Sequence, residues 1–366
     1  MSEKIGVYIH VPFCIRKCPY CDFYSLPFND DTAAAYTAAV LRNIEAYAGN
    51  FQADTLYFGG GTPSLLGGRL VKIVSAAKEA FGLDNAEITL EANPKTVDSR
   101  LLCELSEGGI GRISFGVQSL SPKELAALGR IHTADEALGQ IALARRCGFK
   151  NISADLMLAT PYQTKKSALE SVLGLYRSGV DHISAYMLKI EEGTRFYSEN
   201  MQRLCPNEDE TAEIYLSVCE ELERLGYAQY EISNFAKPGA ESKHNLKYWE
   251  SGNYLGIGPS AHSYIKNRRF AVKNNLKAFI SSPVQEIYVT DESPGDEEEY
   301  AMLALRLARG VQKTEFSRKF GEESYERLLA NAQKLPKCYV NIGKDGFNLT
   351  KEGFLISNTL IGRIIF

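Results

Sequence analysis

The chain has 366 residues, of which 45% are hydrophobic, so it is long enough to form one large domain together with a smaller one. Its formal net charge of −4 and its scattered Lys and Arg residues argue against a protein that binds nucleic acid electrostatically. No apolar run approaches the roughly 20 residues that a membrane span requires, and no secretory signal is recognisable, so we expect a cytoplasmic protein.

Short β-rich runs alternate with amphipathic helical stretches through the first half of the chain. Strands are predicted at residues 5–10, 55–58, 87–91, 112–116, 151–157 and 182–187. Helices are predicted between them, at residues 31–48, 67–81, 98–107, 121–147 and 165–178. Strand–helix units in such a succession indicate a parallel sheet, either doubly wound or barrel-like.

Three cysteines, Cys14, Cys18 and Cys21, follow the first predicted strand within eight residues. Thiolates held this close on one loop can bind one metal centre, and three of them leave one iron of an iron–sulfur cluster with an open position. A structural zinc site is the alternative, because His10 would complete a tetrahedral set. The other cysteines have no framework spacing and are predicted to be reduced thiols acting as small apolar residues, at positions 103, 147, 205, 219 and 338.

Polar residues and glycines also mark the ends of the next strands. Glycines at positions 59–61 precede Thr62 after the second strand, Glu91 ends the third, and Gln118 follows the fourth. The carboxyl ends of barrel strands form one ligand-binding face, so this distribution favours a barrel. The glycines either form a tight turn or let a ligand approach the backbone closely, and they are no phosphate loop because no Gly-Lys-Ser/Thr follows.

The cysteine spacing followed by Gly-Gly-Gly-Thr-Pro at residues 59–63 resembles the radical S-adenosylmethionine superfamily. In that superfamily three cysteines bind a [4Fe–4S] cluster, and S-adenosylmethionine chelates the fourth iron. The resemblance implies that Cys14, Cys18 and Cys21 bind the cluster, and it weighs against zinc. It also implies a set of residues that contact S-adenosylmethionine: Tyr8, Tyr20, Gly60, Gly61, Thr62, Glu91, Gln118, Arg130 and Asp155. Singly, each of these polar residues has a structural alternative, such as a helix-end cation for Arg130.

Residues 8–14 and 112–119 are similar to the oxygen-independent coproporphyrinogen III oxidase group, and the likeness spans most of the chain. It implies an α/β fold, a partial (β/α)6 TIM-like radical S-adenosylmethionine barrel with a small C-terminal winged-helix-like α+β domain. We expect the barrel core at residues 1–235, an extension at 236–290 and the C-terminal domain at 291–366. Residues 155–161 depart from the group, which usually has Tyr-Gly-Leu-Pro or Phe-Gly-Leu-Pro there. Without this glycine, the resemblance does not predict the path of the local loop.

Position 23 separates two functions within this group. The oxidases resemble Cys-x3-Cys-x2-Cys-x-Cys, whereas Phe23 stands here in place of the fourth cysteine. Phe23 and the His-Asn-Leu-Lys-Tyr-Trp segment at 244–249 are similar to haem chaperones of the same fold. The resemblance therefore favours a protein that binds haem and passes it to recipient haemoproteins over a porphyrinogen decarboxylase. It also implies an electron donor, flavodoxin-like or another reductant, and peripheral contact with membrane haemoproteins.

His244 is a candidate ligand of haem iron, and its neighbours Tyr248 and Trp249 are aromatic residues that can shield a porphyrin face. The alternative for His244 is a structural hydrogen-bond pair with Asn245 that anchors a loop. His262 is a weaker candidate for the ligand.

The character of the chain changes after about residue 290. An acidic connector at 291–299 begins a helix that is predicted to run to about residue 309. Helices at 314–320 and 322–334 and strands at 339–341 and 348–350 follow, in an order that resembles a winged helix. The segment lacks a concentrated basic face, so we expect it to cover the barrel mouth or to dock a recipient protein.

Overall fold

The computed structural model describes residues 4–366. Its strands in this range are β1 (Ile5–Val11), β2 (Phe13–Cys14), β3 (Leu26–Pro27), β4 (Ala53–Gly60), β5 (Glu87–Ala92), β6 (Arg112–Gln118), β7 (Asn151–Leu158), β8 (His182–Met187), β9 (Ala228–Glu231), β10 (Asn234–Ala236), β11 (Tyr254–Ile257), β12 (His262–Ile265), β13 (Arg268–Val272), β14 (Ile287–Asp291), β15 (Val311–Gln312), β16 (Val340–Ile342) and β17 (Gly346–Leu349).

The α-helices in the same range are α1 (Asp30–Tyr47), α2 (Arg69–Phe81), α3 (Ser99–Glu107), α4 (Pro122–Ala127), α5 (Ala134–Arg146), α6 (Lys165–Ser178), α7 (Arg195–Ser198), α8 (Glu208–Arg224), α9 (Lys243–Trp249), α10 (Leu276–Ser281), α11 (Glu297–Ala304), α12 (Lys313–Phe320), α13 (Glu322–Ala332), α14 (Lys351–Leu355) and α15 (Ser357–Ile365). Short 3-10 turns lie at Pro63–Leu66, Pro94–Thr96 and Met201–Leu204. No helix within residues 4–366 is both long and apolar enough to cross a membrane.

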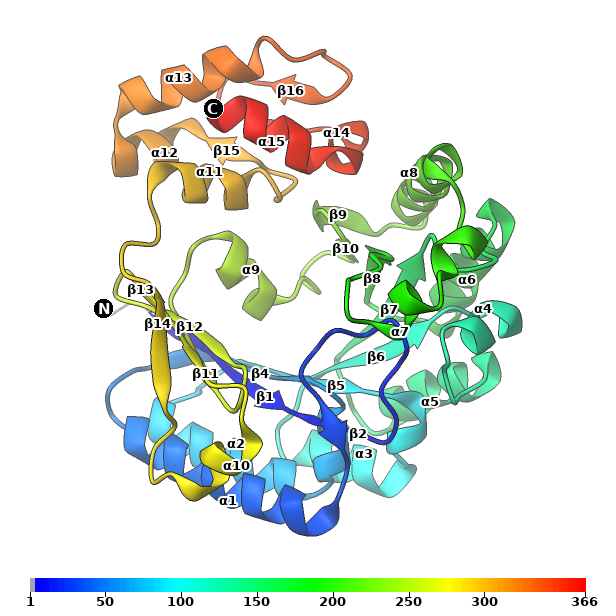
Figure 1. Cartoon of the computed structure of the whole chain (residues 1–366), viewed down its shortest axis with the longest axis vertical. Coiled ribbons are helices and arrows are strands. Elements are labelled where there is room, and N and C mark those ends of the chain that lie inside the picture. The colour runs from blue at the N-terminus through cyan, green and yellow to red at the C-terminus, as the bar shows by residue number, and fades with distance from the viewer. Residues whose placement is uncertain (1–3) are drawn as a thin grey trace.

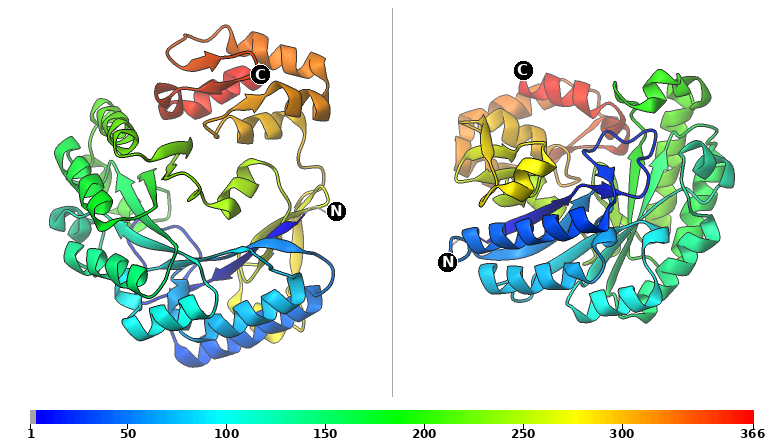
Figure 2. Two further views of the ribbon diagram at one scale, coloured as in Figure 1. Left: turned by 180° about the vertical axis from the view of Figure 1, so that it is seen from behind. Right: turned by 60° about the horizontal axis from the view of Figure 1, so that its bottom comes forward.

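A curved parallel sheet forms the centre of the molecule. Strands β1, β4, β5, β6, β7 and β8 lie side by side in that order, each parallel to the next. Helices α1 to α6 cover its convex outer face (Figures 1 and 2). This arrangement confirms the predicted partial (β/α)6 barrel.

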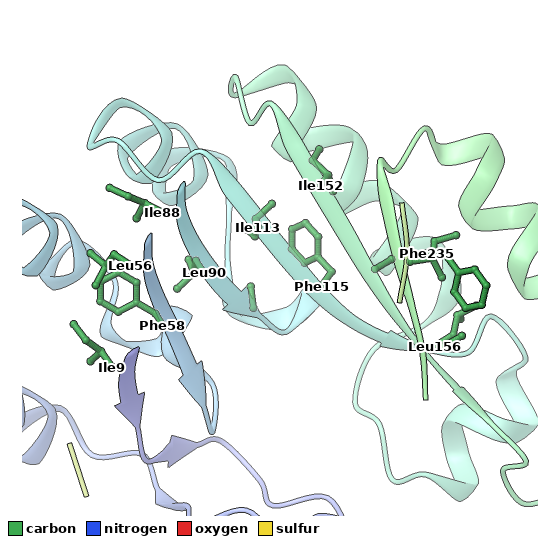
Figure 3. Close-up of a cluster of buried hydrophobic side chains, with 14 of the residues drawn as sticks. Ile9, Leu56, Phe58, Ile88, Leu90, Ile113, Phe115, Ile152, Leu156 and Phe235 are labelled. Atoms are coloured by element: carbon green, nitrogen blue, oxygen red, sulfur yellow. The ribbon is translucent and has the colours of Figure 1, made fainter. Parts of the chain in front are cut away.

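Side chains alternate across each of these strands, and the alternation separates two environments. Apolar residues such as Ile9, Leu56, Leu90, Ile113 and Leu156 are buried in the layer between the sheet and its helices (Figure 3). The intervening positions carry polar side chains that point into the barrel. The core thus lies outside the sheet, and the concave side is left for polar chemistry.

The sheet continues past both ends of the barrel, which the sequence did not predict. On one edge β11 pairs parallel with β1, and β12, β13 and β14 follow as antiparallel strands. On the other edge β10 and β9 add antiparallel strands beyond β8. Residues 254–290 of the predicted extension therefore belong largely to the same sheet as the barrel core.

Three predictions about the outer elements were wrong. The helix predicted at 121–147 is two helices, α4 and α5, because Gly129 adopts a left-handed φ of 68° between them. The helix predicted to reach residue 309 ends at Ala304. Cys103 and Cys147, predicted to be reduced thiols, form a disulfide with Cα atoms 4.6 Å apart, because α3 and α5 pack side by side on the barrel surface.

The C-terminal unit contains α11 to α15 and a small sheet in the order β15-β17-β16, at the top of Figure 1. The predicted helices at 314–320 and 322–334 correspond to α12 and α13, and the predicted strands correspond to β16 and β17. Helices α14 and α15, which no sequence pattern had indicated, complete the unit. Its likeness to a winged helix stays a prediction.

Candidate functional site

The three clustered cysteines lie on the loop that follows β1. Cys14 ends β2, and the Cys21 N–H donates to the Cys18 carbonyl at 3.1 Å, which folds the loop into a turn. All three thiols are free, partly exposed and open to one pocket of about 480 Å³, here called the cysteine pocket. Within residues 4–366, no three His, Cys, Asp or Glu side chains converge on one ion. In a four-iron cluster each thiolate binds a different iron. The three thiols therefore need only line the same pocket and need not converge on one point.

The glycine run after β4 packs tightly against the cysteine loop. Gly60 has a φ of 110°, and a Cβ atom there would lie 2.7 Å from the His10 ring. A Cβ atom on Gly61 would lie 2.6 Å from the Phe13 carbonyl oxygen, and the Thr62 hydroxyl donates to the Cys14 sulfur at 3.7 Å. The fold itself therefore requires these glycines, and their backbone forms one wall of the cysteine pocket.

Arg130 joins the cysteine loop to the barrel. Its guanidinium donates to the Cys18 sulfur at 3.4 Å, to the Gly116 carbonyl at 2.6 Å and to the Asn93 side chain, while its Nε has no partner within the described residues 4–366. Gly129 lies against Pro19, where a Cβ atom would come within 2.9 Å of the ring. Arg130 therefore fixes the cysteine loop at Cys18 against the end of β6.

Two carboxylates, Glu91 and Asp155, line the cysteine pocket inside the barrel. Burial and the negative charge of Asp155 raise the pKa of Glu91 to about 7, although the Tyr57 hydroxyl donates to Glu91 at 2.8 Å. Burial also raises the pKa of Asp155, which accepts from Ser114 at 3.1 Å. This pair can hold a proton near neutral pH and can accept hydrogen bonds from hydroxyl or ammonium groups.

The structure adds pocket residues that the sequence reasoning missed. Tyr57, Arg112, Ser114, Ser184 and Tyr186 line the cysteine pocket together with Glu91 and Asp155. Strand register could have identified three of them, because Ser114 lies opposite Glu91, Ser184 opposite Asp155 and Tyr57 opposite Tyr8 on neighbouring strands. Arg112 is buried, its Nε has no partner among residues 4–366, and its positive charge acts to lower the pKa of Glu91 and of Asp155, against the effect of burial.

The predicted S-adenosylmethionine contacts separate into two groups. Gly60, Gly61, Thr62, Glu91, Gln118, Arg130, Asp155 and Tyr20 all line the cysteine pocket. Gln118 adopts a left-handed φ of 70° at the end of β6, and Tyr20 packs edge-on against Phe196. Tyr8 instead lines a neighbouring pocket, and its hydroxyl lies 3.2 Å from His10 Nδ1. The barrel thus brings together all but one of the predicted contacts.

The neighbouring pocket, here called the aromatic pocket, has a volume of about 600 Å³. Its aromatic lining consists of Tyr8, Phe23, Tyr24, Tyr248 and Tyr254, with the imidazoles of His10 and His262. It shares Asp22, Phe23, Gly60 and Glu91 with the cysteine pocket. The end of the cysteine loop is therefore a common wall between the two.

Within the described residues, His244 lines neither the cysteine pocket nor the aromatic pocket. It is 1% exposed, its Nδ1 lies 2.8 Å from the Thr55 hydroxyl, and its Nε2 lies 2.8 Å from the Tyr248 hydroxyl. Both ring nitrogens are thus engaged, and burial lowers the pKa of the imidazole to about 3. This geometry supports the structural alternative for His244, with Thr55 and Tyr248 as partners in place of Asn245.

The rest of the His-Asn-Leu-Lys-Tyr-Trp segment forms α9, which lies between the barrel and the C-terminal unit (Figure 1). Asn245 reaches the cysteine pocket and Tyr248 reaches the aromatic pocket. Trp249, expected beside a porphyrin, lies instead beneath the Arg306 guanidinium, 5.8 Å from it. The segment therefore touches both pockets from one short helix.

Comparison with known proteins places the chain in a family. A model of the radical SAM superfamily matches residues 8–173. The chain is 34% identical to the haem chaperone HemW of Bacillus subtilis (strain 168), over 98% of this chain and 99% of that protein. The chain belongs to the HemW family. The HemW of Escherichia coli (strain K12) is 33% identical over 98% of this chain and 97% of its own.

The coproporphyrinogen III oxidase HemN from Escherichia coli, described as a radical SAM enzyme, has a similar solved structure. It aligns with a TM-score of 0.82 over 99% of this chain and 90% of its own, at 19% identity. This chain and the oxidase therefore share a fold.

Proposed function

We propose that this HemW-family protein binds haem, a [4Fe–4S] cluster and S-adenosylmethionine, and transfers the haem to recipient haemoproteins. The observation that carries the proposal is the pair of adjoining pockets, one lined by three free thiols and one by aromatic rings and imidazoles. Membership of the HemW family supports the choice of haem as the cargo. An electron donor, flavodoxin-like or another reductant, completes the proposed set of partners.

The donor set in the cysteine pocket fits the two cofactors. Cys14, Cys18 and Cys21 would hold the cluster, with Arg130 donating to Cys18 and the Thr62 hydroxyl donating to Cys14. Bound there, a cluster would supply an iron with an open position and a store for one electron.

Each remaining side chain in the proposed S-adenosylmethionine site has a defined task. Glu91 and Asp155 accept hydrogen bonds from the ligand's ammonium or ribose hydroxyls, and the Arg130 Nε, which has no partner within residues 4–366, donates to its carboxylate. Gly60 and Gly61 line the same pocket, where their backbone groups can bond to the ligand. Tyr57 orients Glu91 through its 2.8 Å hydrogen bond.

Phe23 argues for the chaperone over a coproporphyrinogen decarboxylase. Its side chain is 61% exposed and stands in the wall common to both pockets. An apolar ring there adds to the aromatic lining, whereas a cysteine would add a fourth thiol to the loop. The residue is thus suited to contact a flat apolar cargo.

The test is a haem titration of the full chain after anaerobic reconstitution of the cluster. Saturable binding near one haem per chain, with transfer to an apo-haemoprotein, is the expected result. Iron and sulfide analysis separates a cluster from the zinc alternative. A reconstituted protein that decarboxylates coproporphyrinogen and shows no saturable haem complex would refute the chaperone function.

A matched variant separates the two pockets. Replacing Cys14, Cys18 and Cys21 together by Ala removes the proposed cluster ligands but none of the rings of the aromatic pocket. Haem binding at unchanged stoichiometry is expected in this variant. Loss of all haem binding would place the cargo on the thiols instead.

A further inference from the structure

Only one of the five histidines, all of which lie within residues 4–366, is exposed. His10, His132, His182 and His244 are each buried to 6% exposure or less, and every one makes a ring hydrogen bond. His262 is exposed, and its ring makes no hydrogen bond within the described chain. It is therefore the histidine whose ring nitrogens are available to a ligand.

The fold aims His262 into the aromatic pocket. His262 begins β12 and pairs with Ala271 of β13, and its neighbour Ser263 is fully buried on the opposite face of the strand. The Ser263 hydroxyl accepts from the Gly256 N–H at 2.9 Å, which fixes the register of β12 against β11. With Ser263 held inside, the period of two turns the His262 ring outward to the pocket wall.

The pocket around His262 suits a flat apolar ligand that carries a metal. Its volume of about 600 Å³ lies within the range of small-molecule sites, roughly 300–1,000 Å³. Tyr24, Tyr248 and Tyr254 offer ring faces and edges beside the imidazole. Burial of part of the ring and the nearby Arg269 charge lower the pKa of His262, which keeps the imidazole neutral as metal coordination requires.

The other donors near this pocket are less suitable. His10 donates from Nε2 to the Tyr24 carbonyl at 3.1 Å, so its Nδ1 accepts from the Tyr8 hydroxyl at 3.2 Å and neither nitrogen is free. Burial raises the pKa of Tyr8, Tyr248 and Tyr254, so these phenols stay protonated. The thiols belong to the adjacent pocket.

We propose that His262 is the protein ligand of the haem iron, and that the haem lies in the aromatic pocket beside the wall formed by Asp22 and Phe23. The inference rests on the proposed function, since it concerns the site of the same cargo. It moves the iron ligand from the buried histidine of α9 to the first residue of β12 and leaves Tyr248 as a ring that contacts the porphyrin.

The experiment titrates haemin into the full chain with its cluster reconstituted, so that the cysteines are occupied and cannot capture iron. Difference spectra against the haem-free holoprotein follow the Soret band, and electron paramagnetic resonance reports the ferric spin state. His262→Ala should keep a saturable complex but lose its low-spin or histidine-ligated signature, with affinity reduced at least about tenfold, the low end for groups that support a metal site. Added imidazole should restore the wild-type spectrum.

The matched control is His244→Gln, which removes the other candidate imidazole but retains an amide that can bond to Thr55 and Tyr248. Its haem spectrum should equal that of the wild type. Because the His262 ring is exposed and makes no hydrogen bond within the described chain, His262→Ala should have the same melting temperature as the wild type. Thermal unfolding followed by far-UV circular dichroism checks this.

An unchanged spectrum and affinity in His262→Ala, or a changed spectrum in His244→Gln alone, would overturn the assignment of His262 and leave the chaperone function standing. The absence of a saturable haem complex in the wild type would instead overturn the proposed function itself.

Discussion

Replacing Glu91 by Gln should flatten the pH dependence of stability in the cluster-free protein. The pKa of Glu91 is raised from 4.5 to about 7 by burial and by Asp155, so the folded chain binds this proton more tightly than the unfolded chain does. The resulting stabilisation is complete below about pH 4.5 and is lost as the pH rises through about 7. Between pH 5 and pH 8 the loss amounts to about 2.5 kcal/mol, at 1.36 kcal/mol for each pKa unit.

Urea unfolding at pH 5, 6, 7 and 8 measures this effect. Asp155 and Glu231 also have raised pKa values and contribute a decline of the same sign, so only the difference between wild type and Glu91→Gln isolates Glu91. That difference should grow by about 2.5 kcal/mol from pH 5 to pH 8, in favour of the variant. Tyr57→Phe is the control: it keeps the carboxyl, loses the hydrogen bond that lowers the Glu91 pKa, and should retain the decline. Parallel pH profiles for wild type and Glu91→Gln would refute the reasoning.

Three other outcomes are expected. Ala159 adopts a left-handed φ of 57°, so Ala159→Gly should raise the free energy of unfolding by about 1 kcal/mol, measured as a higher urea midpoint, and a lower midpoint would contradict this. Thiol titration of the denatured, unreduced protein should find six thiols, and eight after reduction; eight thiols before reduction would disprove the disulfide. Cys103→Ser should lower the free energy of unfolding by about 3 kcal/mol. His244→Ala should lower the free energy of unfolding by about 3 kcal/mol, because the hydroxyls of Thr55 and Tyr248 lose their partner. The haem spectrum should stay unaltered, and a shifted Soret band would argue for a ligand role.

The barrel was predictable because its strands are short apolar runs separated by helical patterns, a signal that is local in the chain. The cysteine loop and the strand-end residues Glu91 and Gln118 followed from that prediction, since parallel strands bring their carboxyl ends together. The structure also shows how the loop at residues 155–161 forms without the glycine that is usual there. Ala159 keeps the left-handed backbone that favours glycine, and the Gln163 side chain accepts from its N–H at 2.7 Å.

What the sequence could not show depends on contacts between distant segments. The Cys103–Cys147 disulfide requires α3 and α5 to be neighbours, and a separation of 44 residues gives no sign of that. Arg112 looked like the start of a strand, and only the period of two, applied across adjacent strands in register, places it inside the barrel. His244 was selected for its aromatic neighbours, but its ring faces Thr55 of β4, a contact 189 residues away in sequence.

Helix α9 has a consequence that goes beyond its individual residues. Asn245 stands in one pocket and Tyr248 in the other, and the pockets share the wall at Asp22 and Phe23. Any ligand that displaces this helix or this wall changes the free energy of both pockets at once. Thermodynamic linkage then makes the effect reciprocal: the factor by which occupancy of the first pocket alters affinity in the second equals the factor in the opposite direction.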